Sequence, residues 1–335
     1  MEMFIFSIDK IGTRILDALK RAAGRGVDVK LIVDGIGSPG FTNGVIAGLK
    51  EDLVDVRVYN PINSFFYRLQ QHILRFKWNK IFKLFNHMNR RNHRKVVVID
   101  STVAWVGSAN ISDSYLNWRE TMIRVTGINV SEIIAGFRWM WTCSTVKMKG
   151  RMRPQINFCP TVCHNFTWLN QSKVRRFKIS LLRQAKSSIK ISNPYFIPPY
   201  HLLIPLLKAR KRGVEVTLIT SKVNDVFFVK WFCQSYYKTL LHFGIKVYER
   251  REKFLHSKIL MVDDKRAIVG TSNYNYRSVH WDLEIDLLVN KSETLKSLNK
   301  KWEEDLSESD QIIKPSMNFI LSWILKRASA LRKIS

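Results

Sequence analysis

One spaced pattern of residues occurs twice in this chain, and it constrains the fold more than any other feature. The copies lie at residues 91–110 and 255–273. The pattern comprises His93, Lys95, Asp100, Gly107, Ser108 and Asn110 in the first copy, and His256, Lys258, Asp263, Gly270, Thr271 and Asn273 in the second. Six positions with identical spacing are hard to assign to chance. A chain with such a repeat is expected to consist of two related halves.

Each copy predicts a strand, a turn and a second strand. The runs Lys95–Ile99 and Lys258–Val262 are rich in β-formers and end at an Asp. Side chains two residues apart share one face of a strand, so the His and the Lys of each copy should point the same way. The Asp lies an odd number of residues beyond both, which predicts a turn or structural role for Asp100 and Asp263.

The residue types on this face favour binding of a phosphate group. Lysine supplies positive charge, while the hydroxyl and the amide supply directional hydrogen bonds. Histidine can attack phosphorus or transfer protons near neutral pH. A single His on a strand is usually a packing residue, so it is the pair of copies that indicates a chemical role for these histidines. The face carries Lys rather than a second His or a carboxylate, which disfavours a metal site.

Length and charge limit the class of protein. A chain of 335 residues has ample material for two domains, and its net charge of +28 predicts a polyanionic partner, either nucleic acid or an anionic membrane. The four Cys are expected to be free thiols, because no second pair completes a metal cluster with Cys159, Cys163 and His164. From the sequence we expect neither a bilayer-spanning stretch nor a signal peptide.

The order of the elements predicts an α/β layer architecture. Met3–Phe6 is expected to form a strand, Ile11–Ala23 a helix that closes near Gly24 and Gly26, and Val27–Val33 a strand. Further along, Val54–Tyr59 is expected to be a strand and Val130–Thr142 a helix.

The duplication extends beyond the two motifs. Leu206 to Val216 repeats the pattern of Leu19 to Val29. We therefore predict two similar α/β halves with pseudo-two-fold symmetry and one active site at their interface. The second half has an extra predicted helix, Lys173–Lys186, and strand, Ser188–Ser192. The first half has no such segments, so its N-terminal strand is expected to be missing.

The predicted domain boundaries follow from composition. The first half covers 1–146, with a basic and aromatic insertion at 60–92, and a linker covers 147–170. The second half covers 171–310 and a basic amphipathic segment covers 311–335. No Asp or Glu occurs between Val56 and Ile99, so the insertion suits an interfacial helix on an anionic membrane. An ordinary packed helix, or a surface that stacks single-stranded nucleic acid, is the alternative.

The paired motifs resemble the HxK(x4)D(x6)G(S/T)xN motifs of the phospholipase D superfamily, and the chain is most similar to its bacterial cardiolipin synthases. Residues 25–27, 34–35, 37–39 and 193–196 add to this resemblance. The resemblance implies phosphatidyl transfer from phosphatidylglycerol through a phosphohistidine, without a cofactor. It implies catalytic roles for His93, Lys95, Asp100, His256, Lys258 and Asp263, phosphate binding by Ser108, Asn110, Thr271 and Asn273, and orientation of the histidines by Glu120 and Glu284. His93 is expected to be the nucleophile and His256 the acid.

Several alternatives remain open at this point. A phospholipase D with water as acceptor would use the same residues, and the charge permits a nuclease of the same superfamily. A non-catalytic binding protein is disfavoured because both motifs are intact. The aromatic insertion and the C-terminal segment favour phospholipid substrates, an anionic phospholipid membrane and a peripheral position on the cytoplasmic side of a bacterial membrane. The sequence leaves open whether an accessory protein is required.

Overall fold

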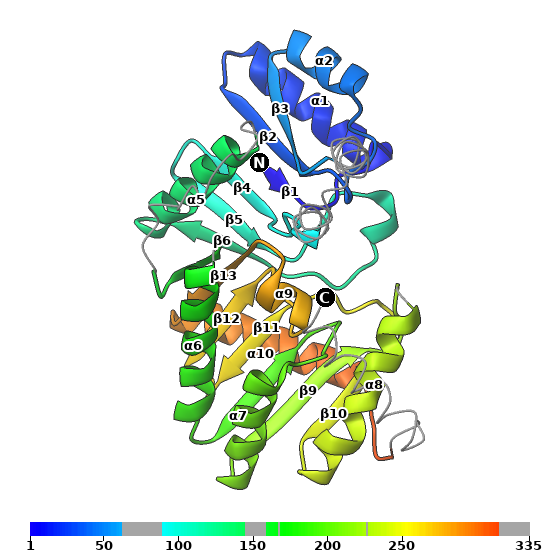
Figure 1. Ribbon diagram of the computed structural model, residues 1–335, viewed down its shortest axis with the longest axis vertical. Coiled ribbons are helices and arrows are strands. Elements are labelled where there is room, and N and C mark those ends of the chain that lie inside the picture. Colours follow the sequence, from blue (N-terminus) through cyan, green and yellow to red (C-terminus); the bar gives the residue numbers. More distant parts are fainter. Residues whose placement is uncertain (62–88, 145–158, 167, 226, 315–335) are drawn as a thin grey trace, which may run out of the picture. The chain divides into compact units, whose positions relative to one another are not determined.

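The computed structural model describes residues 1–61, 89–144, 159–166, 168–225 and 227–314. The chain divides into two compact units (Figure 1). The first comprises Met1–Leu116, Met122–Thr167 and Trp281–Ile285, and the second comprises Asn117–Thr121, Trp168–His280 and Asp286–Ser335. Each unit therefore contains one short segment whose neighbours along the chain belong to the other unit.

The first unit is built on a sheet in the order β3-β2-β1-β4-β5-β6. The strands β3, β2 and β1 are parallel, whereas β1, β4, β5 and β6 pair antiparallel. The elements in chain order are β1 (Glu2–Met3), α1 (Lys10–Gly24), β2 (Val29–Asp34), α2 (Asn43–Glu51), β3 (Val54–Tyr59), β4 (Val96–Ile99), β5 (Val103–Gly107), the 3-10 helix η1 (Asp113–Tyr115), β6 (Met122–Thr126), α5 (Asn129–Cys143) and β7 (Val162–Asn165).

The strands of the second unit follow the order β14-β10-β9-β8-β11-β12-β13. Here β10, β9 and β8 are parallel, and β8, β11, β12 and β13 pair antiparallel. The elements are α6 (Trp168–Gln184), β8 (Ser188–Ser192), α7 (Tyr200–Lys211), β9 (Glu215–Ser221), α8 (Phe227–His242), β10 (Lys246–Arg250), β11 (Ile259–Val262), β12 (Arg266–Gly270), α9 (Tyr276–His280), β13 (Glu284–Val289), α10 (Ser292–Ser307) and β14 (Ser309–Gln311).

The two sheets share six corresponding strands, and the second sheet also contains β14, which pairs with β10. Three parallel strands are followed by three antiparallel ones in each, with β2 and β9, β1 and β8, and β4 and β11 in corresponding places. The repeat also holds at the ends of α1 and α7, where Gly26 and Gly213 have φ of +87° and +88°. In both, the residue after the glycine donates its N–H to a carbonyl of the last helical turn. The prediction of two similar α/β halves is confirmed.

The expected absence of an N-terminal strand in the first half needs a correction. The strand β1 lies between β2 and β4, as β8 lies between β9 and β11. Glu2 pairs with Val96 and Ser192 pairs with Ile259, so the two strands also share their register against the motif strand. The place is therefore occupied by a strand of two residues, which overlaps the predicted strand Met3–Phe6 only at Met3.

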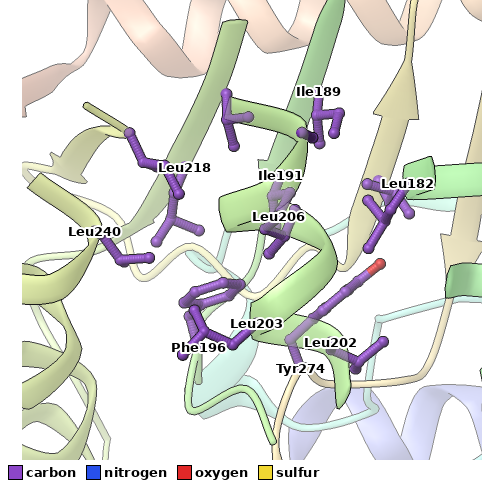
Figure 2. Close-up of a cluster of buried hydrophobic side chains, with 14 of the residues drawn as sticks. Leu182, Ile189, Ile191, Phe196, Leu202, Leu203, Leu206, Leu218, Leu240 and Tyr274 are labelled. Carbon is purple, nitrogen blue, oxygen red and sulfur yellow. The ribbon is translucent and has the colours of Figure 1, made fainter. Parts of the chain in front are cut away.

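Each unit has its own apolar core between sheet and helices. In the second unit, Leu202, Leu203 and Leu206 of α7 pack over Ile191 of β8 and Leu218 of β9, as Figure 2 shows. The helices α6, α7 and α8 lie on one face of this sheet, and α10 lies behind it in the view of Figure 1. This packing anchors β8, which pairs with the second motif strand β11, and β9, whose Ser221 contacts the chain before that strand.

Three predicted segments coincide only partly with described residues. Within the predicted linker 147–170, the described part contains β7 and the beginning of α6. Most of the insertion 60–92 and of the segment 311–335 lies outside the described residues. The membrane roles predicted for these two segments therefore stay predictions.

Candidate active site

Both motifs form the predicted strand, turn and strand, and their polar residues lie at the strand ends. His93 and Lys95 directly precede β4, whereas Ser108 and Asn110 directly follow β5. The two strands are antiparallel, with Val96 opposite Val106. The start of one antiparallel strand lies beside the end of the other, so these four residues gather at one edge of the sheet. The strands β11 and β12 place His256, Lys258, Thr271 and Asn273 in the same way.

The motif lysines are enclosed by protein. Lys95 is 0% exposed and Lys258 is 3% exposed. The ammonium of Lys95 donates to the carbonyl of His93 at 2.7 Å, and that of Lys258 donates to the carbonyl of His256 at 2.5 Å. A buried ammonium is costly unless it meets acceptors or an anion. Each sheet edge therefore holds a fixed positive charge next to its histidine.

Each motif histidine has a carboxylate partner. His93 Nδ1 lies 3.1 and 3.0 Å from the two carboxylate oxygens of Glu284, whose side chain is 0% exposed. His256 Nδ1 lies 2.7 Å from Glu120 Oε1. A carboxylate beside Nδ1 favours the ring tautomer with its proton there, which leaves the lone pair on Nε2. Both Nε2 atoms are thus set for attack or proton transfer.

In both cases the histidine lies in one half of the sequence and its glutamate follows the motif of the other half. His93 and Glu284 are 191 residues apart, and His256 and Glu120 are 136 residues apart. The exchanged segments described above carry the glutamates, because Glu284 lies in Trp281–Ile285 and Glu120 lies in Asn117–Thr121. The sequence indicated both glutamates but not which histidine each one meets.

Main-chain hydrogen bonds hold the exchanged segments in place. Leu283 donates its N–H to the carbonyl of Arg91 and accepts the N–H of His93, at 2.9 and 3.1 Å. In the second unit, Arg119 donates to the carbonyl of Phe254 and accepts the N–H of His256, at 2.9 and 3.0 Å. Leu283 and Arg119 therefore occupy the same backbone position, each directly before a glutamate.

The motif aspartates lie in the hairpin turns. Asp100 and Asp263 have φ of +49° and +55°, and the residue after each also has a positive φ. Aspartate is one of the few non-glycine residues that adopt this conformation readily. Asp263 also accepts N–H bonds from Lys186, Ser187 and Ser188, which fix the turn between α6 and β8. Burial opposes ionisation, but these bonds outweigh it and hold the pKa of Asp263 below its ordinary value.

The two motif asparagines support the sheet edges, Asn110 through its side chain and Asn273 through its backbone N–H. The Oδ1 of Asn110 accepts the N–H of Ile5 at 3.3 Å, and Asn273 donates its N–H to Ser278 at 3.1 Å. Ser108 and Thr271 are both fully buried at the ends of β5 and β12. Ser108 and Asn110 thus lie on one sheet edge and Thr271 and Asn273 on the other, and phosphate binding by these four residues stays a prediction.

Asp34 and Ser221 support the chain before each histidine and were not predicted as site residues. They end the corresponding strands β2 and β9. Asp34 accepts the N–H of Asn92 at 2.9 Å, and Ser221 accepts that of Leu255 at 3.1 Å. Burial raises the pKa of Asp34, opposed by the guanidinium of Arg91. A polar residue at the carboxyl end of a buried strand is the signal that could have identified both.

The surroundings of the two histidines differ. The ring of His256 meets Trp118 at 5.0 Å, Phe254 at 5.9 Å and Tyr195 at 6.4 Å between ring centroids. Tyr195 in turn donates its hydroxyl to Asp225 at 2.6 Å. The ring of His93 meets that of Phe4 at 4.9 Å between ring centroids. None of these aromatic residues belongs to the repeated pattern, and of them only Tyr195 lies in a stretch, 193–196, that adds to the family resemblance.

The faint metal signal at Cys159, Cys163 and His164 has a structural explanation. Arg94 donates to His164 Nδ1 at 2.9 Å, and His164 Nε2 lies 3.0 Å from the carbonyl of Glu132. Burial and the charge of Arg94 lower the pKa of His164 to about 3. Across residues 1–61, 89–144, 159–166, 168–225 and 227–314, no group of three His, Cys, Asp or Glu side chains is arranged to hold a metal ion. Among those same residues, no helix has the length and apolar character needed to cross a bilayer.

Similarity to known proteins covers nearly the whole chain. A cardiolipin synthase of Halalkalibacterium halodurans is 31% identical over 329 residues, and cardiolipin synthase 1 of Bacillus anthracis is 28% identical over 333 residues. Both matches cover 93% of this chain but 62% of the relative, so the chain spans less than two thirds of the length of these curated relatives.

A solved structure supports the fold. The phosphatidylserine synthase of Haemophilus influenzae Rd KW20 superposes with a TM-score of 0.70 at 14% identity, over 99% of this chain and 87% of that one. At this identity the likeness concerns the fold alone. The family described as "Cardiolipin synthase, PLD-like domain" matches residues 1–141 and 179–306, which include both motifs and both glutamates. With this match and the shared architecture, the chain belongs to the cardiolipin synthase, PLD-like domain family, within the phospholipase D superfamily.

Proposed function

We propose that this protein is a cardiolipin synthase, which transfers a phosphatidyl group from one phosphatidylglycerol to another. The observation that carries the proposal is the pair of matching sheet edges. Each holds a histidine whose Nδ1 faces a glutamate and a buried lysine whose ammonium lies at the histidine's own carbonyl. Two such edges supply the nucleophile, the acid and the positive charge that displacement at a phosphodiester needs.

The first step forms a phosphohistidine. The Nε2 of His93 attacks phosphorus, and a P–N bond forms while the P–O bond to the departing glycerol breaks. His256, protonated on Nε2, gives that proton to the glycerol oxygen. Glu284 and Glu120 hold the Nδ1 protons, so that both rings present Nε2 to the substrate. The near-identity of the two edges leaves the opposite assignment of the two histidines as the alternative.

The second step uses the same groups in reverse. His256 takes a proton from the hydroxyl of a second phosphatidylglycerol, whose oxygen attacks phosphorus as the P–N bond breaks. Lys95, Lys258, Ser108, Thr271, Asn110 and Asn273 hold the phosphoryl oxygens in both steps. Because lysines supply the positive charge, the reaction is expected to proceed in the presence of EDTA. Asp100 and Asp263 act through the turns that they form.

The protein reaches its substrate as a peripheral protein on an anionic phospholipid membrane, on the cytoplasmic side of a bacterial cytoplasmic membrane. The net charge of +28 and the acid-free run from Val56 to Ile99 support this part of the proposal. The family match supports phospholipids rather than nucleic acid as substrates. Hydrolysis with water as acceptor would use the same catalytic residues. An accessory protein would likewise leave the roles of these residues unchanged.

The test is lipid analysis by mass spectrometry after expression in bacteria that lack cardiolipin. Cardiolipin is expected to appear with the parent chain and not with His93→Ala. The purified chain should convert phosphatidylglycerol vesicles to cardiolipin and glycerol in EDTA. Phosphatidic acid as the sole product would replace the transferase with a phospholipase D, and cleavage of single-stranded DNA without lipid turnover would favour the nuclease.

A further inference from the structure

Arg119 occupies a position in the second unit at which the two halves differ in chemistry. Its counterpart by main-chain hydrogen bonding is Leu283, and both residues directly precede the glutamate that meets a motif histidine. Leu283 is 1% exposed and packs among apolar side chains, with Ile32, Met140 and Phe166. An apolar residue is therefore sufficient to fill this position in the first unit, and the guanidinium of Arg119 calls for a separate explanation.

The side chain of Arg119 contacts the backbone of Glu120 and the residue that follows His256. Its Nη1 donates to the carbonyl of Glu120, to Thr121 Oγ1 at 3.1 Å and to Ser257 Oγ at 3.3 Å. Ser257 directly follows His256 and returns a hydrogen bond to the carbonyl of Arg119 at 3.1 Å. One guanidinium thus fixes the backbone that carries the glutamate and the backbone that carries the histidine.

Asp305 holds the other side of this guanidinium. Arg119 Nε donates to Asp305 Oδ1 at 2.8 Å, and the side chain of Asp305 is 3% exposed. Arg250 Nε lies 3.4 Å from the same oxygen. Asp305 lies in the last turn of α10, which packs on the second sheet. The exchanged segment Asn117–Thr121 is in this way tied to the frame of the second unit by a buried, charge-assisted hydrogen bond.

We propose that Arg119 and Asp305 form a positioning pair, which holds Glu120 against Nδ1 of His256 and so fixes the ring of this histidine alone. In the first unit, apolar packing of Leu283 performs the corresponding task for Glu284 and His93. The inference deepens the proposed function, on which the role of His256 in proton transfer rests. Neither residue touches the reacting atoms, and both act through Glu120.

The test compares Arg119→Leu, which installs the residue of the other half, with Arg119→Lys and Asp305→Asn in the full chain. With 15N-labelled histidine, NMR reports the tautomer of each ring without any lipid. The parent should show His256 with its proton on Nδ1. Arg119→Leu and Asp305→Asn should give a mixture of tautomers at His256 and leave His93 unchanged. Arg119→Lys keeps the charge but not the two-sided set of N–H donors. Its His256 tautomer mixture should therefore lie between those of the parent and Arg119→Leu.

Turnover gives the second readout. Loss of ring orientation should lower kcat between about 10-fold and 100-fold, with KM for phosphatidylglycerol little changed. Arg251→Leu is the matched control, because Arg251 pairs with Asp310 and with the carbonyl of Ser307 at the same end of α10 but is exposed. It should retain the parent tautomer and kcat.

The outcomes separate this inference from the proposed function. A folded Arg119→Leu or Asp305→Asn with the parent's His256 signal and kcat would overturn the positioning pair. Asp305→Asn preserves side-chain volume, so it supplies the answer if circular dichroism shows that Arg119→Leu does not fold. If Arg119→Leu shifts the His256 tautomer while the parent chain itself makes no cardiolipin, the positioning pair is supported and the proposed transferase activity is rejected.

Discussion

At the scale of single residues, the candidate site is a set of hydrogen bonds that give two histidines the same orientation. Each ring turns Nδ1 to a glutamate, and each lysine ammonium lies at the carbonyl of its own histidine. The shared geometry supports the same chemical competence for both rings. The two rings differ in their aromatic neighbours, and this difference can give them different roles. His93 meets Phe4, whereas His256 meets Trp118, Phe254 and Tyr195.

Replacement of either histidine should remove nearly all transfer. In the proposed mechanism His93→Ala lacks the nucleophile and His256→Ala lacks the acid, so each should lower kcat by at least about 100-fold. The double variant should be little slower than the slower single variant, because residues that act as a unit are not additive. Initial rates of cardiolipin formation measure this. A single variant with near-normal turnover would contradict a shared reaction.

At the scale of elements, the repeated hairpin carries the site, and its turn aspartate shows how one motif position serves the fold. Asp263 joins the β11–β12 turn to the start of β8 through three backbone N–H groups, whereas Asp100 is exposed. The motif aspartate therefore links the turn to a neighbouring segment in the second half, while both aspartates adopt the same left-handed turn conformation.

Asp263→Asn should destabilise the protein at neutral pH by about 1 to 2 kcal/mol, because a charged acceptor of several N–H bonds is lost. The folded pKa of Asp263 is depressed, so its contribution is present above the unfolded pKa of about 4 and is lost as the pH falls through the folded value. Urea denaturation at pH 7 and pH 3 should therefore show a difference from the parent that shrinks in acid.

Asp100→Asn is the control for this comparison. Asn also accepts the left-handed conformation, so both variants keep the turn. Asp100→Asn should change the free energy of unfolding by less than about 0.5 kcal/mol at either pH. An equal loss for both variants would show that the aspartates act through the turn alone and not through the bonds to residues 186–188.

At the scale of the whole molecule, the two units share one topology and exchange one short segment each. The net charge of +28 is a property of the whole chain, and much of the predicted membrane contact lies outside the described residues. Each Lys or Arg near an anionic surface contributes about 1 kcal/mol, and this contribution is screened over a Debye length of about 8 Å at physiological salt. Inserted aromatic side chains are not screened in this way.

Binding to phosphatidylglycerol vesicles should therefore weaken as salt is added but not vanish. A variant with Phe65, Phe66, Trp78 and Trp323 replaced by Ser should keep the salt-sensitive part and lose the part that survives high salt. Co-sedimentation with vesicles measures both parts. Turnover of a soluble short-chain phosphatidylglycerol should be unchanged, since the motifs are intact. Parent-like binding at high salt would exclude these segments as the membrane contact.

The sequence by itself determined the two halves, the hairpin of each motif and the residues at its ends. These features are local, because strand periodicity and turn chemistry act over a few neighbouring residues, and the repeat made the local signal specific. The resemblance to the phospholipase D superfamily selected Glu120 and Glu284 but did not pair either of them with a histidine.

Only the tertiary structure decided those pairings. His93 meets Glu284 across 191 residues, because Leu283 bonds to the backbone on both sides of Asn92 and so places the segment Trp281–Ile285 in the first unit. The tertiary structure likewise brought Asp305 of α10 to Arg119, 186 residues away. Such contacts depend on main-chain hydrogen bonds and packing between distant segments. Their energies are set by the folded arrangement and leave no period or spacing in the sequence.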